Sequence, residues 1–425
     1  MSSSLLLTNC AQVMTLRGLA PRRGRAMSRL GIVKDGAVLI REEKIAAVGA
    51  QGEVEALPEA RDAEKLDLGG RILLPGFVDS HTHLIFPASR AEEYERRIAG
   101  ASYEEIASQG GGILSTVKKL RAAPEDALRK RALDALRQFA AHGTTTVEAK
   151  SGYGLDVESE LKILRLQRAL KSEQPLEMVS TFLGAHVVPR EYRARPGGAE
   201  RYVELLTQRM IPQIAREGLA EYCDVFCDRG AFSLAQARRV LTAARACGMR
   251  LRLHAEQLAH TGATQLGVKL HAASCDHLEK INRADIRGLA KSDTVATLLP
   301  GCCFHLGLQR YAPARELIDA GAIVALATDY NPGTSPTLNM PMILSLACNA
   351  MRMTPAEAIS AATINAAYSL GRDTRIGSIE VGKFADLAVF DLADYREIPY
   401  YFGVNHCWMT IKRGKIIYSR ENLQS

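Results

Sequence analysis

The chain has 425 residues, of which 47% are hydrophobic and 24% are charged, and its formal net charge is +7. This ordinary globular composition excludes wholesale disorder, and the length suits a large barrel domain with a smaller second unit. The basic residues are spread along the chain, so the charge does not indicate a nucleic-acid partner. The one dense basic stretch, residues 17–29, is interrupted by Pro21 and by glycines, and we interpret it as a solvated loop.

Cysteine usage and the N-terminus indicate where the protein works. Nine cysteines are scattered along the chain without a CxxC pair, which predicts reduced thiols in a cytosolic protein rather than a disulfide framework. The first residues, MSSSLLLTNC, lack a basic leader with a long apolar core, so they do not predict a signal peptide. No stretch approaches the roughly 20 apolar residues of a membrane span. We therefore expect a cytoplasmic protein without a membrane partner.

The two ends of the chain share one pattern of short strands and turns. Residues 1–73 contain alternating apolar segments such as GAVLIREEKIAAVG, and no long segment of helical periodicity. From Gly377 onward, GSIEVGKFADLAVFDL and CWMTIKRGKIIYS show the same alternation, broken by Gly-Lys and Arg-Gly turns. We predict a small β-sandwich built from residues 1–73 and 366–425, which flank a central domain at residues 74–365.

The central region repeats a strand followed by a helix. Eight short apolar runs each end in a polar residue or glycine, and segments of helical periodicity separate them. One such segment begins at Pro124 and stops at Gly143, and another stops at Gly248, as expected for helix starts and ends. Eight strand-helix units predict a closed (β/α)₈ barrel, whose chemistry lies at the carboxyl ends of its strands.

Polar side chains stand at the carboxyl ends of seven of the eight runs. The barrel would bring all of these ends to one mouth. In chain order the residues there are His81 and His83, Lys150 and Tyr153, His186, Asp228, His254 and Gln257, His277, and Asp329 and Asn331.

The sharpest local signal is the pair His81 and His83. Residues two apart on a strand point to the same side, so both imidazoles can meet one metal ion. His254 on the fifth strand and Asp329 on the eighth would complete the site. Three nitrogens and one oxygen suit Zn²⁺ or Fe²⁺, and this ligand set does not distinguish between the two metals.

Longer motifs resemble a known family. LPGFVDSHTHL, LRLHAEQ, SCDHLE and LATDYNPGTSP are similar to the amidohydrolase superfamily, and GSIEVGKFADLAVFD resembles its C-terminal return to the β-sandwich. SRAEEYERRIAGASYEEIASQGGGILSTV, EAKSGYGL, TFLGAHVVP and TDYNPGTSP resemble the imidazolonepropionase family within it. The resemblance covers nearly the whole chain. It implies a hydrolase of histidine catabolism that opens the ring C–N amide bond of 4-imidazolone-5-propanoate to give N-formimidoyl-L-glutamate.

Many members of the superfamily bind two metals, which a carboxylated lysine on the fourth strand bridges. Here the fourth run, YCDVFCD, offers no lysine, and Lys150 lies at the end of the second run instead. We therefore expect one Zn²⁺ or Fe ion per chain. We interpret Lys150 as a structural partner behind the metal ligands.

The resemblance also implies catalytic roles. Asp329 would bind the metal, take a proton from water and return it to the leaving nitrogen. His277 would hydrogen-bond the attacking oxygen or polarise the substrate carbonyl. His186 matches a histidine of the family that contacts substrate.

Further residues match the substrate-binding positions of the family. Because the substrate is small and anionic, a guanidinium is the expected partner of its carboxylate. Gln257 occupies a position that is Glu or Gln in the family, and as Gln it cannot act as a base. The turn after Asp329 would present polar groups and backbone amides. The implied substrate-binding set is Arg90, Tyr153, His186, Gln257, Asn331, Gly333 and Thr334.

Two alternatives stay open at this point. A superfamily deaminase of an aminated heterocycle would share the same metal ligands, but Arg90, Tyr153 and the NPGT turn fit an acidic side chain better than a neutral base. A metal-free homologue that uses the barrel as an interaction platform predicts eroded ligands, whereas all four ligand positions are intact. A homodimer is plausible, and the sequence does not decide it.

Overall fold

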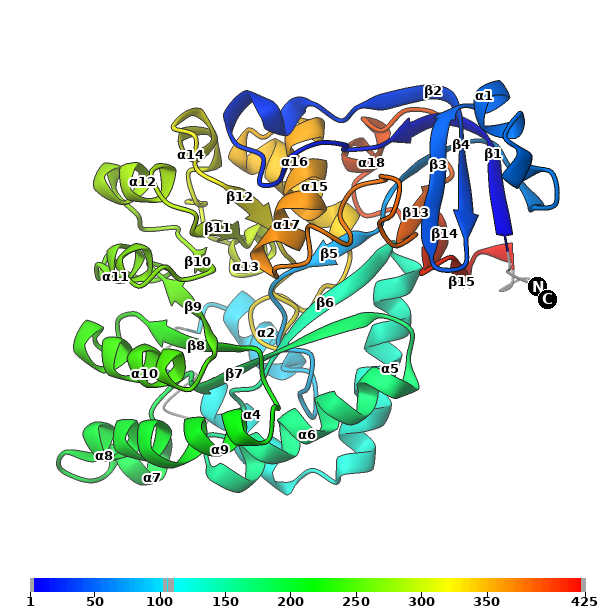
Figure 1. Ribbon diagram of the computed structural model, residues 1–425. Helices are drawn as coiled ribbons and strands as arrows, with labels where there is room; N and C mark the ends of the chain where they lie inside the picture. Colours follow the sequence, from blue (N-terminus) through cyan, green and yellow to red (C-terminus); the bar gives the residue numbers. More distant parts are fainter. Residues whose placement is uncertain (1–3, 102–104, 106–110, 422–425) are drawn as a thin grey trace.

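Two sheets organise the molecule (Figure 1). The computed structural model describes residues 4–101, 105 and 111–421, so part of the motif at residues 89–117 lies outside the described residues. One sheet has eight parallel strands in the order β12-β11-β10-β9-β8-β7-β6-β5, and the other has seven strands. The prediction of a (β/α)₈ barrel with a β unit from both chain ends is therefore confirmed.

Each of the eight predicted apolar runs forms one strand of the parallel sheet, in chain order. Nearly all of their side chains are buried, which explains why the strands read as continuous apolar runs. Their bounds are β5 Phe77–Asp79, β6 Thr144–Lys150, β7 Glu177–Ala185, β8 Tyr222–Cys227, β9 Arg250–Ala255, β10 Ser274–His277, β11 Val295–Leu298 and β12 Val324–Leu326.

The first and last strands of this sheet meet just beyond their carboxyl ends. The backbone N–H of Asp329 donates to the carbonyl of His81 over 3.0 Å, and the N–H of His83 donates to the carbonyl of Tyr330 over 2.8 Å. These bonds close the barrel. They also place the His81–His83 segment directly beside Asp329, although about 250 residues of chain separate them.

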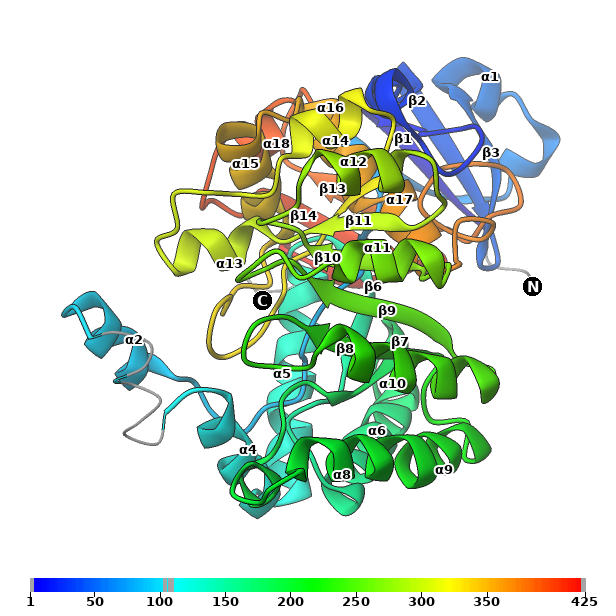
Figure 2. The ribbon, with the colours of Figure 1, turned by 90° about the vertical axis from the view of Figure 1, so that its left-hand side faces the viewer.

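Helices surround the barrel on the outside (Figures 1 and 2). Helix α5 ends where the sequence predicted, because Gly143 adopts a φ of +86° that favours glycine. Ser233 caps α10 and its side chain accepts from the Gln236 N–H. The main helices are α4 Ile113–Ala122, α5 Glu125–Ala141, α6 Val157–Glu173, α8 Gly198–Leu205, α9 Ile211–Arg216, α10 Leu234–Ala246, α11 Ala263–Lys269, α12 Arg283–Ala290, α14 Ala314–Asp319, α15 Met340–Met351, α16 Pro355–Ala362 and α17 Ile364–Ser369.

Shorter elements flank the barrel mouth and the loops. Helix α2 stands out from the barrel body, on the side away from β1–β3 (Figure 2). Helix α13 follows β11 at the mouth. These elements are α1 Gln51–Glu55, α2 Ala91–Ile98, α7 Arg190–Arg193, α13 Pro300–His305 and α18 Glu397–Tyr400.

The seven-stranded sheet joins the two ends of the chain in the order β15-β14-β13-β4-β1-β2-β3. Its central contact pairs β13 antiparallel to β4, with Leu387 opposite Pro75. The domain boundaries at residues 73 and 365 stay predictions. The strands are β1 Ser4–Met14, β2 Ile32–Arg41, β3 Lys44–Ala50, β4 Glu64–Pro75, β13 Leu387–Phe390, β14 Cys407–Lys412 and β15 Lys415–Ser419.

The basic stretch at residues 17–29 is not simply a solvated loop, and that interpretation is wrong for two of its arginines. Arg22 is buried, and its guanidinium donates to the carbonyls of Arg29 and Arg17. Arg23 donates to the carbonyls of Ala290, Gly321 and Ser292. The Arg22 guanidinium therefore closes the segment on itself, and the Arg23 guanidinium fixes it against the barrel.

Among the described residues, no helix has the length and apolar character needed to cross a membrane.

Candidate active site

A pocket of about 340 Å³ opens at the carboxyl ends of the barrel strands. It is lined by most of the residues that the sequence singled out for the site. Among the residues predicted to bind metal or substrate or to act in catalysis, the exception is His81, which is fully buried and does not line the pocket. The predicted residues that line the pocket are His83, Arg90, Tyr153, His186, His254, Gln257, His277, Asp329, Asn331, Gly333 and Thr334.

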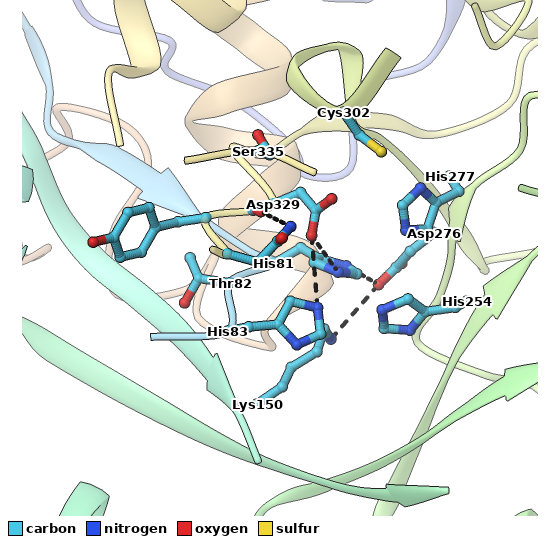
Figure 3. Close-up of polar contacts among 12 residues, drawn as sticks. His81, Thr82, His83, Lys150, His254, Asp276, His277, Cys302, Asp329 and Ser335 are labelled. Atoms are coloured by element: carbon cyan, nitrogen blue, oxygen red, sulfur yellow. Dashed lines mark hydrogen bonds and ion pairs between the residues drawn. The ribbon is translucent and has the colours of Figure 1, made fainter. Parts of the chain in front are cut away.

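The predicted metal ligands lie together at the base of this pocket (Figure 3). Asp329 Oδ1 lies 3.5 Å from His81 Nε2 and 3.6 Å from His83 Nε2. The ring of His254 faces the same space, with its centroid 4.6 Å from that of His81 and 5.5 Å from that of His83. Barrel closure and the position of β9 beside β10 thus bring residues from three distant chain segments to one point.

The donor set of this cluster fits a transition-metal ion. His81, His83 and Asp329 each offer a ligand atom within 4.8 Å of the others, and His81, His254 and His277 do the same. Among the described residues, His81 Nε2 and His254 Nε2 are buried and find no hydrogen-bond partner. Buried imidazole nitrogens without a partner are costly unless something binds them, and a cation would.

Electrostatics keep these imidazoles in the form that binds metals. Burial lowers the pKa of His81 and of His83 well below the usual histidine value, so both rings are neutral near pH 7. Burial also raises the pKa of Asp329 to about 6, although His277 and His254 oppose this shift. For His277, burial favours the neutral ring, but Glu279, Asp329 and Asp276 outweigh it and raise the pKa.

His186 and Tyr153 form one wall of the pocket. The His186 ring stacks on that of His83 with centroids 5.2 Å apart, and Tyr153 lies 5.7 Å from His83. His186 Nδ1 lies 3.0 Å from the carbonyl of Gly152, and burial lowers the pKa of His186 to about 3. The neutral ring therefore donates through Nδ1 and leaves Nε2 as an acceptor.

Arg90 lies at the far side of the pocket, at the start of α2. Its Nε donates to Glu93 Oε2 over 2.9 Å, and the same oxygen accepts from the Gly112 N–H over 3.0 Å. Glu93 also lines the pocket and was not predicted. Its only sequence signal is its place three residues after Arg90 on a helix.

The turn after Asp329 is held by its own asparagine. Asn331 Oδ1 accepts from the N–H groups of Gly333 and Thr334, each over 2.8 Å. We expected this turn to present backbone amides, but these two already have an acceptor. The side-chain amide of Gln257 also has a hydrogen-bond acceptor within the chain, because its Nε2 lies 3.4 Å from Cys302 Sγ.

Gly333 provides the space that Arg90 occupies. A methyl group on its Cα would overlap with Arg90 Nη1. We expect Gly333→Ala to push the flexible guanidinium aside, which would raise KM several-fold and leave the melting temperature nearly unchanged. Steady-state kinetics and a thermal melt check this prediction. An unchanged KM would show that substrate binding does not depend on the present position of the Arg90 guanidinium.

Comparisons with known proteins agree with this geometry. The profile of the Amidohydrolase family matches residues 72–417. The chain is 48% identical over 421 residues to the imidazolonepropionase of Solibacter usitatus, covering 99% of this chain and 100% of that one. It is 46% identical to the imidazolonepropionase of Geobacillus kaustophilus, covering 97% of each. The chain belongs to the imidazolonepropionase family.

Solved structures support the fold of this imidazolonepropionase-family chain. A zinc-bound adenosine deaminase from Xanthomonas campestris superposes with a TM-score of 0.72 at 19% identity, covering 99% of this chain and 94% of that one. A 5-methylcytosine deaminase from Klebsiella pneumoniae gives a TM-score of 0.73 at 16% identity, with 98% of each chain covered. At such low identity the likeness establishes the shared architecture alone.

Sequence reasoning missed the carboxylates behind the metal ligands. Asp276 Oδ2 lies 2.6 Å from His81 Nδ1, and Asp224 Oδ2 lies 3.0 Å from His254 Nδ1. Both aspartates are fully buried in barrel strands. An acidic residue in an otherwise apolar strand was the available signal, because such a group is rarely buried without a partner.

Proposed function

We propose that this chain hydrolyses the ring C–N amide bond of 4-imidazolone-5-propanoate and releases N-formimidoyl-L-glutamate. The observation that carries the proposal is that one pocket contains both the His/Asp cluster and Arg90. A substrate with a cyclic amide and a carboxylate arm needs both features. The relatives named imidazolonepropionase, 46–48% identical over nearly the full chain, support the same reaction.

We propose one Zn²⁺ or Fe ion per chain, held by His81, His83, His254 and Asp329. A divalent ion in such a site lowers the pKa of a bound water to about 7 and so supplies a nucleophile at neutral pH. The donor set supports the assignment, since neutral imidazoles and a carboxylate suit both metals.

The residues around the cluster can carry the proton transfers. In the proposed reaction, the water oxygen bonds to the ring carbonyl carbon and the C–N bond breaks. Asp329 takes the proton from water and delivers it to the departing nitrogen, a role that its carboxylate can fill from its place beside the rings of His81 and His83. His277 donates a hydrogen bond to the carbonyl oxygen as negative charge develops there. His186, whose Nε2 is an acceptor, would receive a ring N–H of the substrate.

Arg90 is the proposed partner of the substrate carboxylate, and Tyr153, Gln257, Asn331, Gly333 and Thr334 would shape the space around the ring. Arg90→Met is expected to lower kcat/KM about 30- to 150-fold, mostly through KM, because a charge-assisted contact contributes about 2–3 kcal/mol. Steady-state kinetics measure the split between kcat and KM. Arg97→Met is the matched control, since Arg97 also lines the pocket but donates to the carbonyl of His305. Equal losses in both variants would contradict the role of Arg90.

A turnover assay on freshly made 4-imidazolone-5-propanoate, with and without a chelator, tests the proposed function. We expect the substrate absorbance to fall as N-formimidoyl-L-glutamate forms. We expect the chelator to abolish this activity and added Zn²⁺ or Fe²⁺ to restore it. A chain that binds metal but leaves this substrate untouched would overturn the substrate assignment. A panel of aminated heterocycles would then test the deaminase alternative.

The proposed partner is this small anionic heterocycle, and we propose no nucleic-acid or membrane partner. A cytosolic location is consistent with the nine cysteines, all of which are free thiols. A homodimer stays a prediction, which light scattering on the purified protein would test.

A further inference from the structure

Two buried carboxylates lie directly behind the proposed metal ligands. Asp276 Oδ2 lies 2.6 Å from His81 Nδ1, and Asp224 Oδ2 lies 3.0 Å from His254 Nδ1. The Asp276 carboxylate holds the ring hydrogen of His81 at Nδ1, so the lone pair of His81 Nε2 faces Asp329. Asp224 lies within ion-pair distance of the His254 ring, and its Oδ1 accepts from the His254 backbone N–H over 3.2 Å. The orientation of two metal-binding imidazoles therefore depends on where Asp276 and Asp224 are held.

A third carboxylate holds the backbone between the two histidines of the first strand end. Glu148 Oε2 accepts from the Thr82 N–H over 3.2 Å, and the Glu148 carbonyl accepts from Thr82 Oγ1 over 2.6 Å. Thr82 separates His81 from His83, so Glu148 fixes the segment from which both rings project.

One ammonium group connects these three carboxylates, and Figure 3 shows its contact with Asp276. Lys150 Nζ lies 2.9 Å from Glu148 Oε1, 2.9 Å from Asp224 Oδ2 and 3.8 Å from Asp276 Oδ2. The Lys150 side chain is fully buried, as are those of its three partners. Among the described residues, the other cation against this group is Arg252, whose Nη2 lies 3.7 Å from Asp276 Oδ2 and donates to the carbonyl of Ser80.

Charge explains why a lysine is needed here. Three buried carboxylates repel one another, and each would cost several kcal/mol to bury without a cation. Burial disfavours the charged form of Lys150, but Asp224 and Glu148 outweigh it and raise the pKa. Lys150 thus stays an ammonium and draws the carboxylates toward one point. Without it, the carboxylates would lose the cation that holds them together, and Asp224 and Asp276 would no longer be fixed against the rings of His254 and His81.

We propose that Lys150 is a positioning residue of the metal centre and that it sets the metal affinity. Its ammonium group holds three carboxylates in place: Asp224 at the His254 ring, Asp276 at the His81 ring and Glu148 at the Thr82 backbone. The inference rests on the proposed function, because it concerns the metal site of that reaction. It assigns Lys150 no contact with substrate.

The test compares Lys150→Met with a matched control, Lys412→Met. Lys412 is also a buried lysine in an ion pair, 2.6 Å from Asp386 Oδ2, but it lies in β14 away from the pocket. For the wild type and both variants we would measure the Zn²⁺ dissociation constant against a chromophoric chelator, the visible spectrum of the Co²⁺-loaded protein, and the melting temperature.

We expect Lys150→Met to bind Zn²⁺ about 10- to 100-fold more weakly and to alter the Co²⁺ spectrum. Lys412→Met should lower the melting temperature but keep the wild-type Zn²⁺ affinity and Co²⁺ spectrum. If Lys150→Met does not fold, Asp276→Asn tests the same clamp with a nearly isosteric change, and the same loss of affinity is expected.

The outcomes separate this inference from the proposed function. A wild-type chain that binds no Zn²⁺ or Co²⁺ overturns both. Tight binding in the wild type and equally tight binding in Lys150→Met, or in Asp276→Asn where the lysine variant does not fold, overturns the inference alone. A similar loss of affinity in Lys412→Met would also overturn it, because the effect would then follow from general destabilisation.

Discussion

Asp329→Asn is expected to lower kcat about 10³- to 10⁴-fold, the largest loss that we predict for a single substitution. The asparagine keeps the size of the side chain but cannot accept a proton, and general acid-base catalysis by one group contributes roughly 10²- to 10⁴-fold. It also removes the charge of a proposed metal ligand, so the Zn²⁺ affinity should fall as well. Steady-state kinetics at saturating Zn²⁺ would separate the loss of the base from the loss of the metal.

Asp79→Asn is the matched control for this substitution. Asp79 is also a fully buried carboxylate, two residues before His81, and burial raises its pKa to about 7. It accepts from Thr328 and does not line the pocket. We expect a much smaller loss of kcat there. If Asp79→Asn were as damaging as Asp329→Asn, the loss would reflect strain in the barrel rather than proton transfer.

His277→Ala is expected to lower kcat about 10²- to 10³-fold while the protein keeps its metal. Removing one hydrogen-bond donor to a developing oxyanion typically has this effect. His277 lines the pocket beside Asp329, and its raised pKa favours the donor form. The measurement is kcat together with metal content per chain.

The metal content decides how a loss in His277→Ala is interpreted. A full complement of metal with low kcat supports a role for His277 toward the substrate. Loss of the metal would instead make His277 a ligand, which the grouping of its ring nitrogen with His81 and His254 allows geometrically. Unchanged turnover would remove His277 from the mechanism.

The elements of the barrel could be predicted because their signals are local. Each of the eight apolar runs became a strand, and α5 ends before Gly143 because the φ of +86° there favours glycine. The strand alternation at both chain ends likewise predicted a β unit built from both termini, but the pairing of β13 with β4 within it was not predicted. Hydrophobic periodicity and turn residues are patterns of neighbouring positions, so they can be recognised directly in the sequence.

The basic stretch shows where local reading fails. Arg22 and Arg23 stand beside Pro21 and several glycines and resemble a solvated loop. Arg23 nevertheless donates to carbonyls more than 250 residues away, and Arg22 donates to carbonyls at the ends of its own loop. The sequence does not distinguish an arginine that donates its hydrogen bonds to water from one that donates them to backbone carbonyls. Only the folded chain decides which of the two it meets.

The candidate site divides in the same way. The predicted residues that line the pocket followed from their places at strand ends and from the family resemblance, and the structure brings them together. Glu93 beside Arg90, and the clamp of Lys150, Asp224 and Asp276, did not follow. Asp224 and Asp276 lie far from Lys150 in the chain, and no spacing rule connects them, whereas the (i, i+3) spacing of Arg90 and Glu93 was a local signal that the prediction did not use.

By itself, the sequence determined the order of the strands and helices, the residues at the barrel mouth and the ligand types that can hold a metal, because periodicity, turns and side-chain chemistry are local properties. The tertiary structure alone decided which ring nitrogen of His81 faces Asp329. That choice depends on Asp276, which the fold of the barrel places at His81 Nδ1. Hydrogen bonds between distant segments form only after the chain has folded, and so they leave no mark in the spacing of residues.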